Sequence, residues 1–384
     1  MSLTGAAVER LLAAKEIVVV CGAGGVGKTT TAAALATVAA DLGAKVLVLT
    51  VDPARRLAAA MGLDALGNAE TRVSAEAFAE AGLEPRGELW AAMLDTKQSW
   101  DALVRRHAPD TATCDAILAN PLYRNVTGKF VHSHDYIAME RLYELHSSGV
   151  YDLIVVDTPP TGHTIDFLEA PERMADFFSS RLLRWLLVPY RSRLLNVASR
   201  PFYQIADRAL GSAFLTDVAE FFILFQSMYE GFVARARAVE RVLEDHRTSF
   251  VVVTTLEAAP AHEASRFVGV LASKHLHLGA VVLNRVLPSE LLDGDASEAA
   301  RELRRRPEAL AAALADPPGP LPLVARVLQE LGESFLNFAV VAKREAELRA
   351  ELAVDPALVA TVPALDTDVY DLAGLARLGR ELRR

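Results

Sequence analysis

Residues 22–29 read GAGGVGKT, and this run constrains the fold of the 384-residue chain more than any other feature. It matches the phosphate-binding pattern G-x-x-x-x-G-K-[ST] completely. The β-branched run Ile17–Cys21 precedes it, and the alanine-rich stretch Thr29–Ala40 follows it. This order of strand, loop and helix directs backbone N–H groups and a helix N-terminus toward phosphate oxygens. The alternative is an ordinary glycine-rich turn, which would not explain the strand before the loop and the helix after it.

The loop residues have distinct expected roles. Lys28 should reach the β- and γ-phosphates and take part in catalysis, and the Thr29 hydroxyl should ligate Mg²⁺. The glycines allow the backbone to approach the phosphates closely. The other predicted nucleotide contacts are Gly22, Ala23, Gly24, Gly25, Val26, Gly27 and Thr30.

Short apolar runs alternate with helical stretches along most of the chain. Such runs suit strands that are buried on both faces, and helices between them favour βαβ units. The pattern predicts an α/β fold of the P-loop NTPase type, with a doubly wound, mostly parallel sheet and an inserted helical subdomain. The expected strands after the first are Val46–Thr50, Leu89–Leu94, Leu153–Val156, Phe250–Thr254, Ala280–Leu283 and Val359–Val362.

The domain prediction is one ATPase domain over residues 1–384. Residues 96–148 and 166–247 have helical spacing with little strand signal, so we expect two insertions that form one subdomain. Within 177–232 the apolar residues are interpreted either as a groove for a client helix or as core. We favour core for most positions. The charged, alanine-rich range 288–320 is expected to be mobile, and 322–353 to be one long helix.

Composition narrows the class of protein. The formal net charge of −9 argues against nucleic-acid binding by bulk charge. Two cysteines exclude a disulfide framework and favour a reducing compartment. We see no signal peptide, and the most apolar stretches are too short or too charged to span a bilayer. The expected location is cytoplasmic, with peripheral membrane contact as an option.

Two aspartates follow predicted strands. Asp157 comes directly after Leu153–Val156, a position suited to holding Mg²⁺ through water. Asp52 ends the second strand and is interpreted as the group that orients or deprotonates the attacking water. It is also predicted, with Thr29 and Asp157, to hold Mg²⁺, partly through water. A turn or N-cap role before Pro53 is the alternative for Asp52.

A proline-rich turn follows Asp157. Its hydroxyls can respond to the presence of the γ-phosphate, as ordered switch loops do. The predicted switch residues are Thr158, Pro159, Pro160, Thr161, Gly162 and His163.

The runs GAGGVGKTT, DPARRL and DTPPTGHT occur in this order and resemble the P-loop, switch I and switch II of one family. This is the family of arsenical pump ATPases (ArsA) and tail-anchored protein targeting ATPases, a branch of the deviant Walker A ATPases that include MinD and ParA. The resemblance implies ATP/ADP and Mg²⁺ as cofactors. It further implies a dimer that closes around two nucleotides and moves helical insertions that bind a client. Asn284 then matches the family's adenine-recognising residue, and Pro363 lies in a segment that lines the adenine pocket.

The chain departs from this family at Ala23, where the usual P-loop begins Gly-Lys-Gly-Gly. That lysine reaches the phosphates of the other subunit, and a methyl group cannot replace its charge. Hydrolysis would then be slow, or Arg55 or Arg56 would supply the cation, or a paralogue with the lysine would form a heterodimer. We favour the last two, so the expected partner is a second copy or a paralogue.

The cysteine and histidine patterns also differ from metal-binding members. Cys21 and Cys114 are too few for a three-thiolate arsenite site, and no Cys-x-x-Cys pair is present for zinc. The sequence therefore resembles a bacterial member without either site. His132–Asp135 and the pair His275 and His277 are interpreted as polar loop residues rather than metal ligands.

Three functions stay open at this point. The first is a dimeric ATP-hydrolysing switch that binds a protein or membrane-linked client. The second is the soluble energising subunit of an anion transporter. The third is a nucleotide-binding regulatory partner of an active paralogue.

Overall fold

The computed structural model describes residues 3–51, 55–124, 131–160, 220–225, 228–314, 318–352 and 359–384, with short pieces between 165 and 176. Its strands form one sheet in the order β3-β4-β2-β5-β1-β6-β7-β8, parallel throughout except for β3 against β4. The strands are β1 Ile17–Gly22, β2 Lys45–Thr50, β3 Thr71–Arg72, β4 Glu88–Met93, β5 Leu153–Asp157, β6 Thr248–Thr254, β7 Leu278–Val286 and β8 Val359–Pro363. The predicted mostly parallel α/β fold is confirmed.

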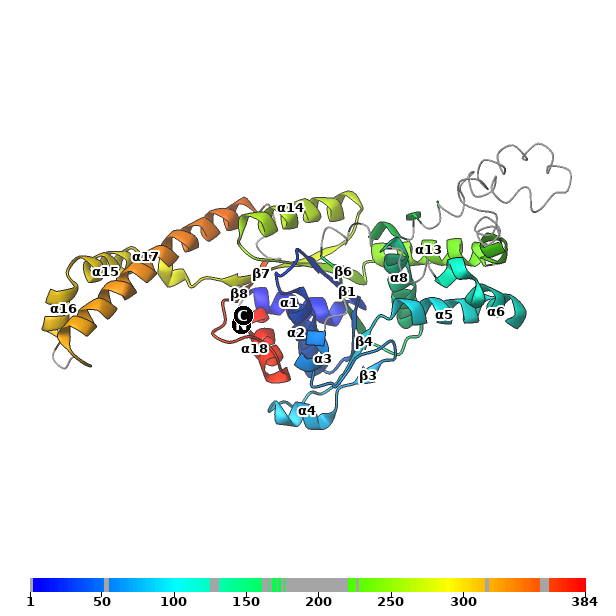
Figure 1. Ribbon diagram of the computed structural model, residues 1–384, viewed down its shortest axis with the longest axis horizontal. Helices are drawn as coiled ribbons and strands as arrows, with labels where there is room; N and C mark the ends of the chain where they lie inside the picture. Colours follow the sequence, from blue (N-terminus) through cyan, green and yellow to red (C-terminus); the bar gives the residue numbers. More distant parts are fainter. Residues whose placement is uncertain are drawn as a thin grey trace.

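Helices cover both faces of the sheet (Figure 1). One face carries α1 Leu3–Ala14, α2 Lys28–Asp41, α3 Arg55–Ala60, α4 Ala75–Glu80 and α18 Leu372–Leu382. The other carries α5 Thr96–His107, α6 Thr111–Ala119, α8 Val131–Ser147, α13 Tyr229–Glu244 and α14 Ala258–Ser273.

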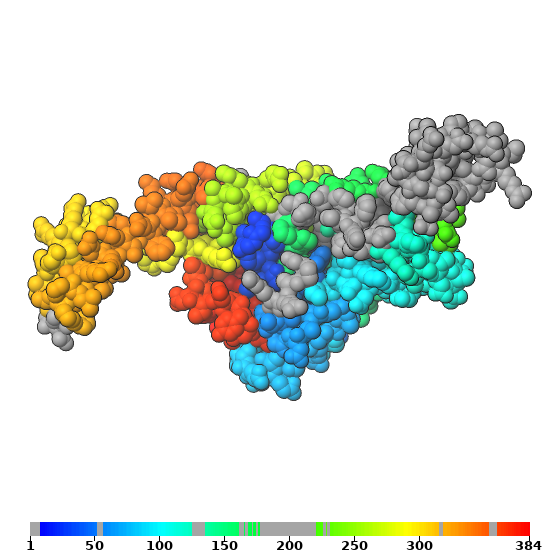
Figure 2. Space-filling model, in the orientation of Figure 1, coloured from blue at the N-terminus to red at the C-terminus, as the bar shows by residue number. Residues whose placement is uncertain are grey.

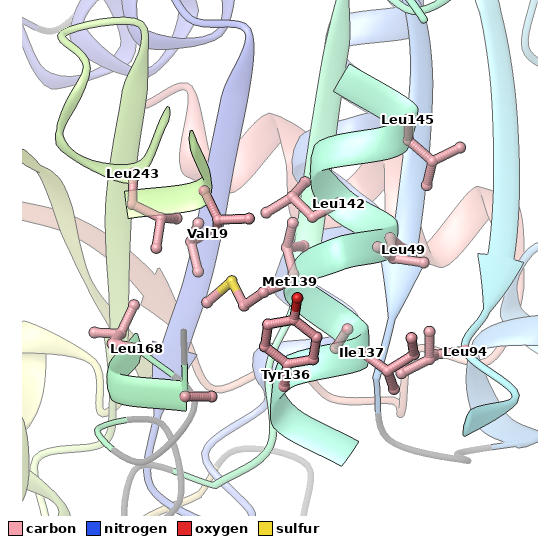
Figure 3. Close-up of a cluster of buried hydrophobic side chains, with 14 of the residues drawn as sticks. Val19, Leu49, Leu94, Tyr136, Ile137, Met139, Leu142, Leu145, Leu168 and Leu243 are labelled. Carbon is pink, nitrogen blue, oxygen red and sulfur yellow. The ribbon is translucent and has the colours of Figure 1, made fainter. Parts of the chain in front are cut away.

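The central strand β1 explains why continuous apolar runs form the core. Successive side chains of a strand point to opposite faces. Val19 and Cys21 therefore join the cluster under α8, whereas Val18 and Val20 join the cluster under α2. Figure 3 shows Met139 and Leu142 of α8 directed toward Val19. Because both faces are covered, only apolar residues fit along this strand.

Within 96–148 the structure describes the helices α5, α6 and α8. In the second insertion, residues 166–247, the longest described helix is α13. Residues 177–219 lie outside the described part of the chain. Aromatic rings join the two insertions: Trp100 of α5 lies 5.8 Å from Tyr136 of α8 and 6.1 Å from Phe232 of α13, between ring centroids. The assignment of both insertions to one subdomain remains a prediction.

One interpretation was wrong. Residues His132–Asp135 are not a loop, because they form the first turn of α8. The apolar residues Tyr136, Ile137 and Met139 are fully buried, and packing of this face on the sheet extends the helix through the polar residues before it. Helical stability of this kind comes from tertiary packing rather than from local propensity.

The range 288–320 contains the 3₁₀ turn η1 Ser289–Leu292 and the helices α15 Gly294–Arg305 and α16 Pro307–Ala313. They precede α17 Leu321–Glu351, which confirms the long helix expected at 322–353. The mobility expected for 288–320 stays a prediction. Among the described helices, none is long and apolar enough to cross a bilayer.

Candidate functional site

The predicted phosphate loop lies between the end of β1 and the start of α2. Gly27, the residue before α2, has φ 95° and ψ 25° and so adopts the left-handed conformation that glycine tolerates best. It has no side chain to accept hydrogen bonds from the N–H groups of the first helical turn. An external anion can therefore accept them, as at other helix N-termini.

Two glycines are required by close packing as well as by backbone conformation. A Cβ atom at Gly22 would lie 2.1 Å from the Val253 carbonyl oxygen, and one at Gly27 would lie 2.4 Å from Asn284 Nδ2. The loop is thus packed closely against the backbone of β6 at Gly22 and against the Asn284 side chain of β7 at Gly27.

Lys28 folds back over the loop. Its Nζ donates a hydrogen bond of 2.9 Å to the carbonyl oxygen of Ala23, and the residue is only 8% exposed. Ala23 is itself buried, so the position that differs from the resembling family lies directly beneath the lysine. A cation in this place faces the loop that the sequence assigns to phosphate.

Three oxygen-bearing side chains meet at the end of β5. The Thr29 hydroxyl donates to Asp157 Oδ2 over 2.8 Å, and the Thr50 hydroxyl donates to the same atom over 3.1 Å. Asp157 and Thr50 are fully buried. Hydroxyl and carboxylate oxygens are the ligands that Mg²⁺ prefers, so the donor set fits this ion.

Thr50 was missed from sequence. It is the last residue of β2, and its hydroxyl is the one polar group at the end of the run Val46–Thr50. A hydroxyl at the carboxyl end of a buried parallel strand is the signal that would have identified it, because ligands gather at that edge.

The predicted switch residues begin next to the loop. Thr158 is buried, and both its N–H and its hydroxyl donate to the Val20 carbonyl oxygen, at 3.3 and 2.9 Å. A Cβ atom at Gly24 would lie 4.0 Å from the ring of Pro160, so the turn passes beside the loop. Pro159 follows Thr158 in the described chain. Thr161, Gly162 and His163 lie outside the described residues.

The predicted water-activating residue Asp52 also lies outside the described residues. Its neighbour Val51 is described, and the Val51 N–H donates to the Asp157 carbonyl oxygen over 3.1 Å. The described chain therefore stops, at Val51, beside the end of the strand that holds Asp157. Arg55 and Arg56 begin α3, but their side chains are not among the described ones.

Asn284 reaches the loop from β7. Its Nδ2 donates to the carbonyl oxygen of Val26 over 2.7 Å, which links β7 to the loop across β6. Pro363 ends β8 and pairs with Val286 of β7. The structure thus brings Asn284 into contact with the loop, whereas Pro363 lies one strand further out.

The other polar groups singled out from sequence lie elsewhere. Cys21 is fully buried, and burial raises the pKa of its thiol to about 12. Cys114 is buried in the core under α8. His275 has a left-handed backbone (φ 56°) in the turn before β7, and His277 Nε2 lies 3.1 Å from the Glu244 carbonyl oxygen.

A cavity of about 370 Å³ lies apart from the phosphate loop, among α5, α8 and α13. Its charged lining includes Arg106, Arg141, Arg235 and Glu140. Arg235 Nε lies 2.9 Å from Glu140 Oε1, and Glu140 is 95% buried, with 5% of its surface exposed. The lining of the cavity contains none of the site residues expected from sequence, so the cavity is distinct from the phosphate site.

The apolar stretch of the second insertion is mostly core where it is described. Phe221, Phe225 and Met228 are buried in the cluster under α8, and Ile223 is 40% exposed. Core was the favoured interpretation for most of these positions.

Comparison with known proteins agrees with the loop geometry. The sequence model of the anion-transporting ATPase family matches residues 15–306. The chain belongs to this family. An ATPase of the family hydrolyses ATP, and Thr29, Lys28 and Asp157 lie inside the matched range.

Individual relatives are distant but cover most of the chain. An uncharacterized protein of Streptomyces coelicolor is 32% identical over 71% of this chain and 62% of its own length, which is less than two thirds. An ATPase ASNA1 homologue of Paramecium tetraurelia is 27% identical over 69% of this chain and 73% of its own. The ATPase BagA of Mycobacterium tuberculosis is 27% identical over 73% and 68%.

Proposed function

We propose that this ATPase is a dimeric switch, in which the nucleotide state controls binding of a protein or membrane-linked client. The convergence of Thr29 and Thr50 on Asp157, beside the loop covered by Lys28, carries the proposal. Lys28 and the N–H groups of α2 would bind the β- and γ-phosphates. Thr29 would bind Mg²⁺ directly, and Asp157 would bind it through water.

Magnesium, when bound, would neutralise the charge of the phosphates during transfer. The residue before Asp52 in the chain, Val51, donates its N–H to the Asp157 carbonyl oxygen, and this contact supports a role for Asp52 near the metal. We assign to Asp52 the orientation and deprotonation of the attacking water. ADP and phosphate would be the products.

Because Ala23 stands where the family has a lysine, the proposal must also name the source of the missing positive charge. The buried methyl group contributes no charge toward a second subunit. The missing cation would come from Arg55 or Arg56, or from the lysine of a paralogue in a heterodimer. A homodimer with slow hydrolysis is the remaining arrangement.

Coupling to a client would begin at the turn after Asp157. Thr158 is fixed to β1 and Pro160 adjoins Gly24, so a change in the loop reaches the segment that leads to the second insertion. Helices α5, α8 and α13 share an aromatic core and would move with that segment. Asn284 would additionally read the adenine, and Pro363 would line its pocket.

The test is nucleotide binding and turnover of the purified chain. Wild-type protein should bind ATP with Mg²⁺, and Lys28→Ala should lose binding while keeping its fold by circular dichroism. Turnover is then measured alone and with a lysine-bearing paralogue. A wild type that binds no nucleotide contradicts the proposal, and a chain that binds ATP but only raises the paralogue's turnover is a regulatory partner.

The family description favours a second candidate, a soluble subunit that energises an anion transporter. Co-purification with an integral membrane protein, and ATP turnover stimulated by an anion, would support it. Client binding without either would support the switch.

A further inference from the structure

The cavity of about 370 Å³ among α5, α8 and α13 takes no part in the proposed function. Figure 1 places these three helices beside one another. Figure 2 shows the α5 and α6 segment, in cyan at the right, at the opposite end of the molecule from the yellow and orange helices α15, α16 and α17. Pockets for small molecules have volumes of about 300–1,000 Å³, so the cavity has room for a small organic ligand.

Part of the cavity lining is buried and part reaches the surface. Leu103 and Ile137 are 8% and 1% exposed. Arg106, Ser147 and Ser148 of the same lining are exposed. The lining thus changes from exposed to buried, as in a pocket that a ligand enters from solvent.

The lining contains three arginines, and each belongs to a different helix. Arg106 lies on α5, Arg141 on α8 and Arg235 on α13. A guanidinium group has five N–H donors in a planar fork, which matches the two oxygens of a carboxylate. Arginine is therefore the residue most suited to a carboxylate in a partly buried place.

Glutamates of the protein use some of these donors. Glu144 Oε1 lies 2.5 Å from Arg106 Nη2, and Glu144 Oε2 lies 3.0 Å from Arg141 Nη1. Glu70, outside the lining, lies 2.5 Å from Arg141 Nη2. The Nε atom of Arg141 is buried without a hydrogen-bond partner in the described chain.

Arg235 is paired in a similar, incomplete way. Its Nε donates to both oxygens of Glu140, at 2.9 and 3.2 Å, whereas its Nη2 is buried without a hydrogen-bond partner in the described chain. A buried donor without an acceptor is costly. The protein therefore does not use the full hydrogen-bonding capacity of its cavity arginines.

His107, which also lines the cavity, reports the sign of the local electrostatic potential. Burial lowers the pKa of His107, and the charges of Arg235 and Arg106 lower it further, against the opposing effect of Glu144. The positive groups therefore outweigh the negative one at this place. An anion that enters the cavity would meet a favourable potential.

We propose that the cavity binds a small organic carboxylate, with its oxygens at the arginines and its apolar part against Leu103, Ile137 and Tyr143. The lining has three arginines and two glutamates, so a ligand with one negative charge balances it. The apolar side chains favour an organic molecule over an inorganic ion. The site is separate from the phosphate loop, so the inference does not rest on the proposed function.

The experiment is calorimetric titration of the nucleotide-free chain with sodium benzoate and with benzamide. The two probes have similar shapes, but only benzoate is charged. Benzoate should bind saturably, and benzamide roughly 10-fold more weakly, because charge-assisted hydrogen bonds are about twice as strong as neutral ones. Lys28→Ala should bind benzoate as the wild type does, which separates this site from the phosphate loop.

A pair of charge variants tests the role of the arginines. Arg106→Gln and Glu144→Gln both remove the ion pair between these residues, so a purely structural effect would change benzoate affinity in the same direction. At the proposed site, Arg106→Gln should weaken benzoate binding and Glu144→Gln should tighten it, each by about 2- to 5-fold for partly exposed charges.

A second pair of variants tests the location. Ala102 lines the cavity, whereas Ala234 is exposed on α13 outside the lining. Ala102→Phe should abolish benzoate binding and Ala234→Phe should retain it, with both folded by circular dichroism. The NMR signals of the His107 ring, identified by their loss in His107→Asn, should shift with benzoate in the wild type but not in Ala102→Phe.

Four results would overturn the proposal. They are no benzoate binding by the wild type, equal binding of benzamide, affinity changes of the same sign in the two charge variants, and benzoate binding retained in Ala102→Phe.

Discussion

The Thr29 hydroxyl donates a hydrogen bond of 2.8 Å to Asp157 Oδ2, although 128 residues separate the two in sequence. The contact joins the start of α2 to the end of β5, which neighbours β1 in the sheet. It brings a hydroxyl and a carboxylate together at the edge where ligands of parallel sheets bind. The first prediction concerns this pair.

Asp157→Asn keeps the shape of the side chain and removes its charge. If Asp157 holds the metal through water, the Mg²⁺ requirement of ATP turnover should rise by about 10- to 100-fold, as for other outer ligands. The measurement is ATPase rate against Mg²⁺ concentration. Thr50→Val, which removes one hydrogen bond to the same oxygen, should have a smaller effect. An unchanged Mg²⁺ dependence in Asp157→Asn would count against the metal role.

Asn284 gives the second prediction. Asn284→Ala removes its hydrogen bond to Val26, and a bond of this kind contributes about 0.5–1.5 kcal/mol. ATP affinity, measured by calorimetric titration, should fall by roughly 2- to 10-fold. Asn284→Asp should weaken binding further, because a carboxylate would face the Val26 carbonyl oxygen. Equal ATP affinity of the wild type and both variants would show that Asn284 does not contribute to nucleotide binding.

The sequence could predict the loop, the strands and Asp157 because each rests on a local pattern. The run Ile17–Cys21 is apolar without interruption because β1 is covered on both faces, and Asp157 follows a run of the same kind. A complete phosphate-loop pattern between a strand and a helix adds a motif with few alternatives.

The features that could not be predicted from the sequence depend on contacts between distant segments. Thr50 resembles any strand residue until β2 and β5 are paired, when its hydroxyl meets Asp157. His132–Asp135 is helical because the residues after it pack on the sheet, which the polar run itself does not encode. The long helix α17 was predicted only in part, since helical spacing at 322–353 does not reveal which of its apolar side chains are exposed to solvent.

Gly27 supports a third prediction with a matched control. Gly27→Ala introduces a Cβ atom 2.4 Å from Asn284 Nδ2 at a φ of 95°. Gly25→Ala has a φ of 80° but nothing within 4 Å of its Cβ. Backbone strain of about 1–3 kcal/mol is common to both. In urea unfolding, Gly27→Ala should therefore be the less stable variant.

The contact with Asn284 can be isolated by a second substitution. Asn284→Ala should restore part of the stability lost in Gly27→Ala and none of that lost in Gly25→Ala. If the two glycine variants are equally stable, the close approach of Asn284 does not constrain position 27.

The fourth prediction concerns the buried pair Glu140 and Arg235, which joins α8 to α13. Burial raises the pKa of Glu140, and the Arg235 guanidinium opposes this rise. Arg235→Gln would leave the carboxylate buried without its cation, which costs about 3–5 kcal/mol when the carboxylate is charged. The variant should therefore be strongly destabilised near neutral pH.

The sign of the pH dependence follows from the raised pKa of Glu140. A carboxyl whose pKa is higher in the folded state than in the unfolded state binds its proton more tightly when folded. Its contribution to stability is thus fully present below the unfolded pKa and is lost as pH rises through the folded pKa. Arg235→Gln raises that folded pKa further, so its deficit against the wild type should be small in acid and grow toward neutral pH. Urea unfolding across this range measures the deficit, and the double variant Glu140→Gln/Arg235→Gln should lose this pH dependence. A deficit of constant size in the single variant would show that the pair acts through packing alone.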